Sequence, residues 1–153
     1  RRVLCRSNLL IGAMLAGKTF ANSPVAAVHA LAYPIGGTFH ISHGLSNSLV
    51  LPYVLRFNSV DVKAAKDYAE LAPYVFPDLN TDKGAQAVSA EFIDRMEELS
   101  KRLGLPQKLR EVDIPKNACE KMARDAMKQT RLLVNNPREV KEADAFNIYQ
   151  AAW

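Results

Sequence analysis

The chain of 153 residues has few histidines and cysteines and lacks any apolar run long enough to cross a bilayer. The stretch from Leu9 to Ala16 is far shorter than the ~20 residues that a spanning helix needs, and no signal peptide is visible. The two cysteines, Cys5 and Cys119, form neither a CxxC pair nor a disulfide framework, which favours a reducing compartment. We therefore expect a cytoplasmic protein with no membrane partner.

Charge of neither sign dominates. The net charge is only +4, with 24% charged and 48% hydrophobic residues. The basic residues stand beside acids, as where Glu97-Glu98 precedes Lys101-Arg102, which is typical of a solvated helix surface. Nucleic acid is therefore not an expected partner. The length and composition fit a single globular domain over residues 1–153.

Strand-like alternation is essentially absent, whereas apolar residues recur at three- and four-residue steps. This pattern predicts an all-α fold, a bundle of about seven helices joined by short loops. The expected helices cover residues 2–19, 24–33, 43–55, 61–72, 83–103, 115–130 and 141–152. Residues 109–114 are expected to form a connector. The helix over 24–33 is apolar on almost every side and should be buried.

Prolines and glycines mark the predicted boundaries. Asn22-Ser23-Pro24 is typical of a helix start, and Gly104 of a helix end. We expect Pro34 and the pair Gly36-Gly37 to end the second helix. Pro52 should interrupt or bend the third helix, and Pro73 should lie in a loop.

All three histidines fall within fifteen residues, as His29, His40 and His43. Imidazole is the commonest protein ligand for a transition metal and the usual proton carrier near neutral pH. His29 and His43 lie fourteen residues apart, with Pro34 and Gly36-Gly37 between them, so they cannot form an i, i+4 pair on one helix. The segment therefore indicates a metal or catalytic site built from two elements joined by a turn.

The run AGKTFANSPVAAVHALAYPIGGTFHISHGLSNSLVLPYVLRFN (16–58) resembles the signature of the iron-containing alcohol dehydrogenases. Its pattern is a small-residue helix leading into H-A-x-A, then P-x-G-G, H-G and a helix ending near F-N. The segments LGLPQKLREVDI (103–114) and NPREVKEADAFNIYQAA (136–152) are similar to that family's last helices. The resemblance thus covers nearly the whole chain.

The resemblance implies a dehydrogenase with an N-terminal α/β domain that binds NAD or NADP and a C-terminal helical domain. A divalent metal, Fe²⁺ or Zn²⁺, is held between them by one Asp and three His. The motif's two later histidines match His29 and His43. The Asp, the first His and the Gly-rich pyrophosphate loop have no counterpart in this sequence, so the resemblance implies the C-terminal part of a longer enzyme, inactive alone.

Other roles follow from the same match. Tyr33 stands where many members carry a histidine thought to relay a proton, and a tyrosine hydroxyl titrates near ~10 rather than ~6.5. His40 could line the substrate pocket, relay a proton or face solvent. Gly36 and Gly37 would let the chain approach the nicotinamide closely. Asn47 follows H-G as a motif Asn does, with either a capping or backbone-bonding role or a substrate contact.

Several alternatives stay open. Besides an alcohol dehydrogenase acting on an alcohol, aldehyde or ketone, the same superfamily includes oxo-acid reductases and polyol dehydrogenases. Phe20 and Phe39 are either pocket walls or core. A homodimer or higher homo-oligomer is expected from the family. A different class is a non-catalytic helical module that binds a partner through a bare apolar face including residues 24–33.

Overall fold

The computed structural model describes the backbone of residues 2–153 and the side chains of residues 5–153. Over that range the chain forms eight α helices, one 3-10 helix and no strand, which confirms the predicted all-α fold. The elements are α1 (Arg2–Asn22), α2 (Ala27–Phe39), α3 (His43–Asn58), α4 (Val62–Val75), α5 (Ala85–Arg102), η1 (Leu109–Val112), α6 (Ala118–Ala126), α7 (Thr130–Leu133) and α8 (Glu142–Ala152).

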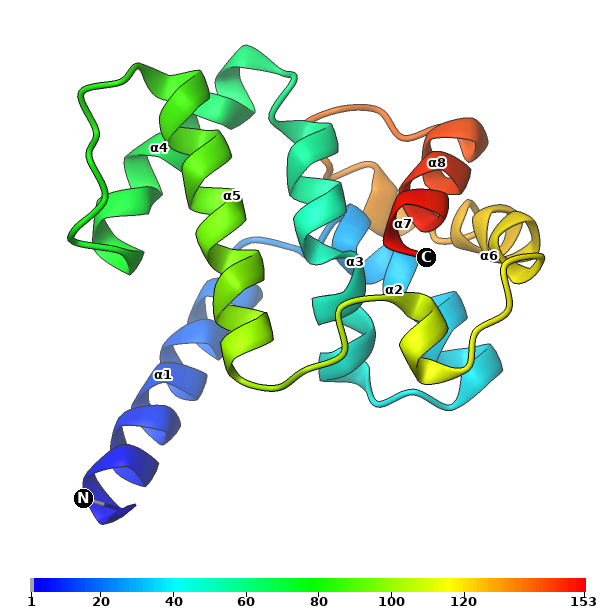
Figure 1. Cartoon of the computed structure of the whole chain (residues 1–153), viewed down its shortest axis with the longest axis horizontal. Helices are drawn as coiled ribbons and strands as arrows, with labels where there is room; N and C mark the ends of the chain where they lie inside the picture. Colours follow the sequence, from blue (N-terminus) through cyan, green and yellow to red (C-terminus); the bar gives the residue numbers. More distant parts are fainter. Residues whose placement is uncertain (1) are drawn as a thin grey trace.

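The helices pack around two apolar clusters (Figure 1). The larger cluster joins α2, α3, α6 and α8, and the smaller one joins α4 and α5. Helix α3 lies between the two groups, since it packs against α2 and α8 on one side and against α5 on the other. Because α3 also begins with His43, the same central helix holds the two groups together and positions a candidate site residue.

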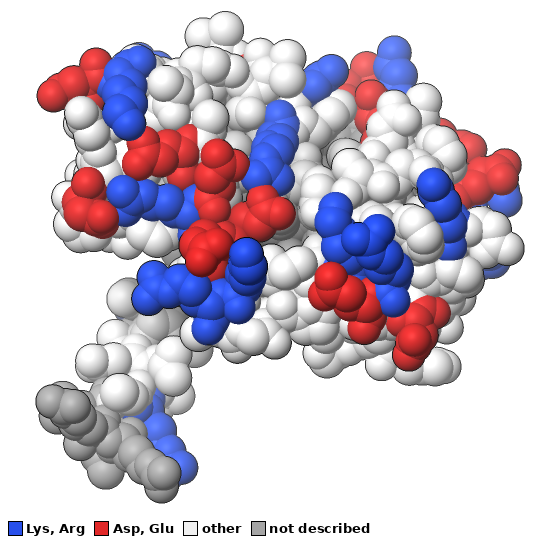
Figure 2. Space-filling model, viewed as in Figure 1, with Lys and Arg blue, Asp and Glu red and all other residues white. Residues whose placement is uncertain are grey.

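Helix α1 projects away from the other helices (Figure 1). In Figure 2 the described part of this helix shows mostly white surface with basic residues in blue. Its described large apolar side chains are exposed. They are Leu9, Leu10, Ile11, Met14, Leu15 and Phe20. Within residues 2–153, no helix combines the length and the apolar character needed to cross a bilayer.

The predicted stretch 24–33 is buried in part, whereas Pro24 and Tyr33 are exposed. Ala27, Ala30, Leu31 and Ala32 are at most 1% exposed. These four side chains already pack within the domain and so do not contribute to the bare apolar face that was predicted to include this stretch. A run of exposed apolar side chains lies on α1 instead.

The predicted end of α2 is also wrong. The helix begins at Ala27, not at Pro24, and continues through Pro34, Gly36 and Gly37 to Phe39. An internal proline removes one helical hydrogen bond and costs ~3 kcal/mol in an isolated helix. Here Pro34 and its neighbour Ile35 are buried, so core packing compensates for the local preference.

Two further helices also continue through a proline at which a break, a bend or a loop was predicted. Helix α3 is continuous through Pro52, and α4 runs through Pro73 to Val75, where a loop was predicted. The predicted helix 115–130 is shorter, since α6 covers only Ala118–Ala126, and a separate helix, α7, begins at Thr130. Residues 109–114 form a connector, as expected, and Gly104 follows α5 with a positive φ of 75°.

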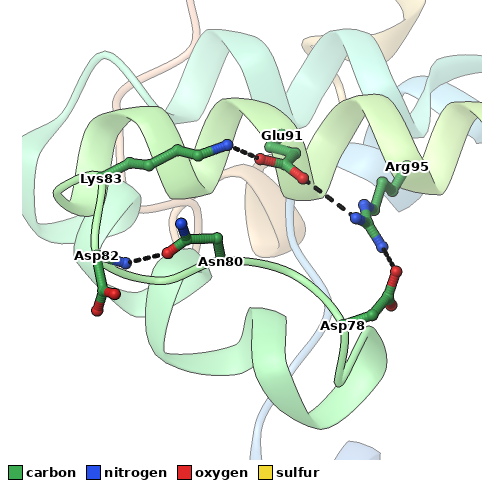
Figure 3. A network of polar contacts seen from close by, with 6 residues as sticks. All are labelled: Asp78, Asn80, Asp82, Lys83, Glu91 and Arg95. Carbon is green, nitrogen blue, oxygen red and sulfur yellow. Dashed lines mark hydrogen bonds and ion pairs between the residues drawn. The ribbon is translucent and has the colours of Figure 1, made fainter.

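Ion pairs tie the loop between α4 and α5 to α5 (Figure 3). Lys83 and Arg95 both pair with Glu91, at 2.8 and 3.2 Å, and Arg95 also pairs with Asp78 at 2.6 Å. Acidic and basic side chains are mixed over the face seen in Figure 2. The charges there are largely matched with one another.

Buried hydrogen bonds connect segments far apart in the sequence. The Tyr149 hydroxyl, on α8, donates to the Leu31 carbonyl oxygen at 2.6 Å and so fixes α8 against α2. The side-chain amides of Asn58 and Asn136 exchange two hydrogen bonds, at 3.1 and 2.7 Å. These bonds position the end of α3 and the final helix around the core.

Candidate metal and substrate site

His29 and His43 come together at the surface where α2 meets the start of α3. Their ring centroids lie 5.2 Å apart with an interplanar angle of 53°. His29 is half-buried, whereas His43 is exposed. The prediction that the two histidines come from separate elements joined by a turn is confirmed, since residues 40–42 connect α2 to α3.

The candidate residues of α2 share one face of the helix. His29, Tyr33 and Gly37 are spaced four residues apart, and residues at that spacing lie above one another. The Tyr33 ring is 49% exposed, and its centroid lies 6.4 Å from that of His43. An aromatic hydroxyl side chain therefore borders the histidine pair on an open surface.

The short turn between the helices determines the position of His43. A Cβ atom on Gly36 would lie 3.2 Å from the Ile41 carbonyl oxygen and 3.5 Å from Ser46 Oγ. The buried Ser46 hydroxyl in turn lies 3.3 Å from the Ile41 carbonyl oxygen and 3.0 Å from that of Ser42. Gly36 thus allows the turn to close tightly against α2, which brings His43 beside His29.

The other predicted site residues have a less direct relation to the pair of His29 and His43. His40 ends α2 in the left-handed conformation (φ 56°, ψ 26°), its side chain is exposed, and it makes no ring contact with the histidine pair. Gly37 is exposed, and a Cβ there would have no atom within 4 Å. Phe39 packs against the larger apolar cluster, whereas Phe20 is exposed on α1.

The environment of His29 favours the neutral imidazole. Burial, and then the neighbouring His43, lower the pKa of His29 below its ordinary value of 6.5. At neutral pH its ring therefore retains an unprotonated nitrogen. An unprotonated nitrogen is the form of histidine that binds a metal ion.

Asn47 makes a contact with the His43 ring that the sequence pattern did not predict. Its side-chain nitrogen lies 2.9 Å from the His43 carbonyl oxygen and 3.1 Å from His43 Nε2, and its Oδ1 is buried without a partner. The spacing of four residues is the signal that could have identified it, since such residues are neighbours on a helix. The predicted backbone-bonding role of Asn47 is confirmed, and a bond to the ring is added.

The described residues bring together two candidate metal ligands and no complete metal set. Among them no group of three or more His, Cys, Asp or Glu is arranged to hold an ion. The fold and this site define a helical domain that presents a pair of imidazoles on an open face.

The chain belongs to the Fe-containing alcohol dehydrogenase family. Residues 3–153 match the C-terminal part of that family. Long-chain-alcohol dehydrogenase 1 of Geobacillus thermodenitrificans is 37% identical over 148 residues, which cover 97% of this chain and 37% of that protein. The 1,3-propanediol dehydrogenase of Citrobacter freundii is 31% identical over 149 residues, again 97% of this chain and 37% of the relative.

A solved structure shows the same fold. The alcohol dehydrogenase from Oenococcus oeni superposes with a TM-score of 0.82 and 29% identity, over 92% of this chain and 36% of that one. The chain therefore spans little more than a third of the length of such relatives. Its relatives are alcohol and propanediol dehydrogenases, which agrees with the predicted family.

Proposed function

We propose that the full-length protein is a metal-dependent, NAD(P)-dependent alcohol dehydrogenase and that this chain is its helical metal and substrate domain. The observation that carries the proposal is the pairing of His29 with His43. Two imidazoles bound at ~2.0–2.1 Å to one tetrahedral ion would have ring centres roughly 5 Å apart. The observed separation is 5.2 Å, so the pair fits a shared divalent ion.

The nature of the two donors supports Fe²⁺ or Zn²⁺ as the ion. Both metals accept imidazole nitrogen, and a carboxylate and a third imidazole from the remainder of the protein would complete the set. When bound, such an ion acts as a Lewis acid that polarises the oxygen of an alcohol or carbonyl substrate. In this proposal, His29 and His43 hold the ion and keep it at the open face of the domain.

The remaining residues of the face would contact the organic reactants. Tyr33 borders the pair, and its hydroxyl is available to donate a hydrogen bond to the substrate oxygen. His40, at the end of the same helix, is proposed to carry a proton in the reaction. Gly37, together with Gly36, leaves room for a nicotinamide to approach the helix closely.

The relatives guide the choice of substrate and cofactor. Their names refer to long-chain alcohols, 1,3-propanediol and lactaldehyde, so we propose a small-molecule alcohol or its carbonyl form as substrate. NAD or NADP would be bound mainly by the part of the protein outside this chain. We also propose a homodimeric or larger homo-oligomeric assembly in the cytoplasm.

The test is metal analysis of the full-length protein and of three histidine variants. We expect about one equivalent of iron or zinc in the wild type and its loss, with NAD(P)-coupled alcohol oxidation, in His29→Ala and in His43→Ala. His40→Ala is the matched control and should retain the metal, since His40 lies apart from the pair. Metal retained in both pair variants would show that these histidines are structural and would overturn the proposal.

A further inference from the structure

Asn47 lies one helical turn after His43 on α3, and its amide is bonded to that histidine alone. The side-chain nitrogen is 2.9 Å from the His43 carbonyl oxygen and 3.1 Å from ring atom Nε2. No other hydrogen bond is formed by the Asn47 side chain among the described residues, and its Oδ1 is buried without a partner.

The carbonyl contact determines which way the amide faces. A backbone carbonyl oxygen can only accept a hydrogen bond, so the Asn47 atom beside it must be the NH₂ nitrogen and not the oxygen. One amide hydrogen is directed to the carbonyl of His43, and the second is directed to Nε2.

The same geometry determines the tautomer of His43. Because the Asn47 nitrogen only donates, Nε2 must be the acceptor, and a neutral imidazole then carries its proton on Nδ1. The lone pair of Nε2 is thus the one that this ring can offer to a metal. In metal sites a hydrogen bond more often falls on the ring nitrogen that does not ligate, so the Asn47 amide must leave Nε2 when an ion binds there.

Helix stability does not explain the choice of asparagine here. Asparagine is a poor residue for a helix interior, and a buried oxygen without a partner costs ~1–3 kcal/mol. An apolar side chain of similar size at position 47 would avoid both penalties. The benefit of Asn47 must therefore come from its contact with His43.

We infer that Asn47 is a positioning residue that holds His43 as the Nδ1–H tautomer, with the Nε2 lone pair kept unprotonated for a metal ion. In the metal-free protein the Asn47 amide donates its hydrogen bond to Nε2, and this bond breaks when an ion binds there. This inference rests on the proposed function for its purpose, whereas the tautomer itself follows from the contacts of Asn47.

Nitrogen-15 NMR of the metal-free, full-length protein tests the tautomer, with the His43 signals assigned from a His43→Gln variant. The wild type should show the Nδ1–H form. Asn47→Leu, which cannot donate, should give a mixture of tautomers, and the isosteric Asn47→Asp, which accepts, should give the Nε2–H form. The same tautomer in all three proteins would overturn the inference.

Titration with Co²⁺, followed by its visible absorption, tests the link to metal binding. We expect Asn47→Leu to weaken Co²⁺ binding by ~2- to 5-fold, because a ring free to change tautomer and orientation presents the Nε2 lone pair only part of the time. An unchanged affinity in a variant whose tautomer has changed would overturn the positioning role. If the wild type itself bound no Co²⁺ at the pair, the proposed function would fail, whereas the NMR result would stand independently. Thermal unfolding of each variant verifies that it is folded.

Discussion

The tight closure of the α2–α3 turn predicts opposite effects for two adjacent glycines. Gly36 and Gly37 are both helical, so replacing either with alanine should gain ~1 kcal/mol from helix propensity. A Cβ on Gly36 would lie 3.2 Å from the Ile41 carbonyl oxygen, whereas a Cβ on Gly37 has nothing within 4 Å. Only Gly36→Ala therefore requires the neighbouring backbone to move.

The displacement needed is a few tenths of an ångström, and overpacking of this kind costs ~1–3 kcal/mol. We expect Gly37→Ala to be more stable than the wild type by ~0.5–1 kcal/mol. Gly36→Ala should be less stable than Gly37→Ala by ~1–2 kcal/mol, because the steric cost offsets the helical gain. Gly36→Val, with two further methyl groups beside the turn, should be less stable again.

Urea unfolding of the three variants, monitored by circular dichroism, measures these differences. Because Gly36 also sets the position of His43, Gly36→Val should weaken Co²⁺ binding while Gly37→Ala leaves it unchanged. Equal stabilisation by Gly36→Ala and Gly37→Ala would refute the reasoning, since it would show that the Ile41 carbonyl yields without cost.

Three further predictions concern stability. Tyr149→Phe removes the buried bond to Leu31 and should cost ~1–2 kcal/mol in denaturant unfolding. Burial raises the pKa of Tyr149, so wild-type stability should fall as pH rises above ~10, where the unfolded tyrosine ionises, and Tyr149→Phe should lessen that fall. His40→Gly should stabilise the protein by ~0.5–1 kcal/mol, because glycine adopts a φ of 56° without strain; a lower melting temperature would contradict this. Asn136→Ala removes the donor to the buried Asn58 Oδ1, while the Asn58 nitrogen keeps the Tyr68 hydroxyl as acceptor, and should cost ~1–3 kcal/mol by the same unfolding assay.

The sequence was sufficient to predict the long helices and to single out the pair of His29 and His43. Helical periodicity indicated every long helix, because amphipathic spacing is a local property of the chain. The concentration of His29, His40 and His43 in one segment pointed to the site, and the family pattern selected His29 and His43 as the metal pair. The roles of Tyr33 and of the other site residues stay predictions.

Tertiary packing decided what local signals could not. Pro34 and the two glycines after it are helix breakers in isolation, yet α2 continues through them because Pro34 and Ile35 are buried. Spacing makes Asn47 and His43 neighbours on the helix, but the bond to Nε2 depends on the orientation of the His43 ring, which spacing does not supply.

The longest-range contacts show the limit most clearly. Tyr149 reaches the carbonyl of Leu31 across 118 residues of sequence. The sequence around each of these two residues holds no signal for this contact, because such a bond forms only when packing brings the two helices together. The sequence alone therefore determined which residue types are candidates for binding a metal, and the packing of α2 against α3 and α8 decided where they lie.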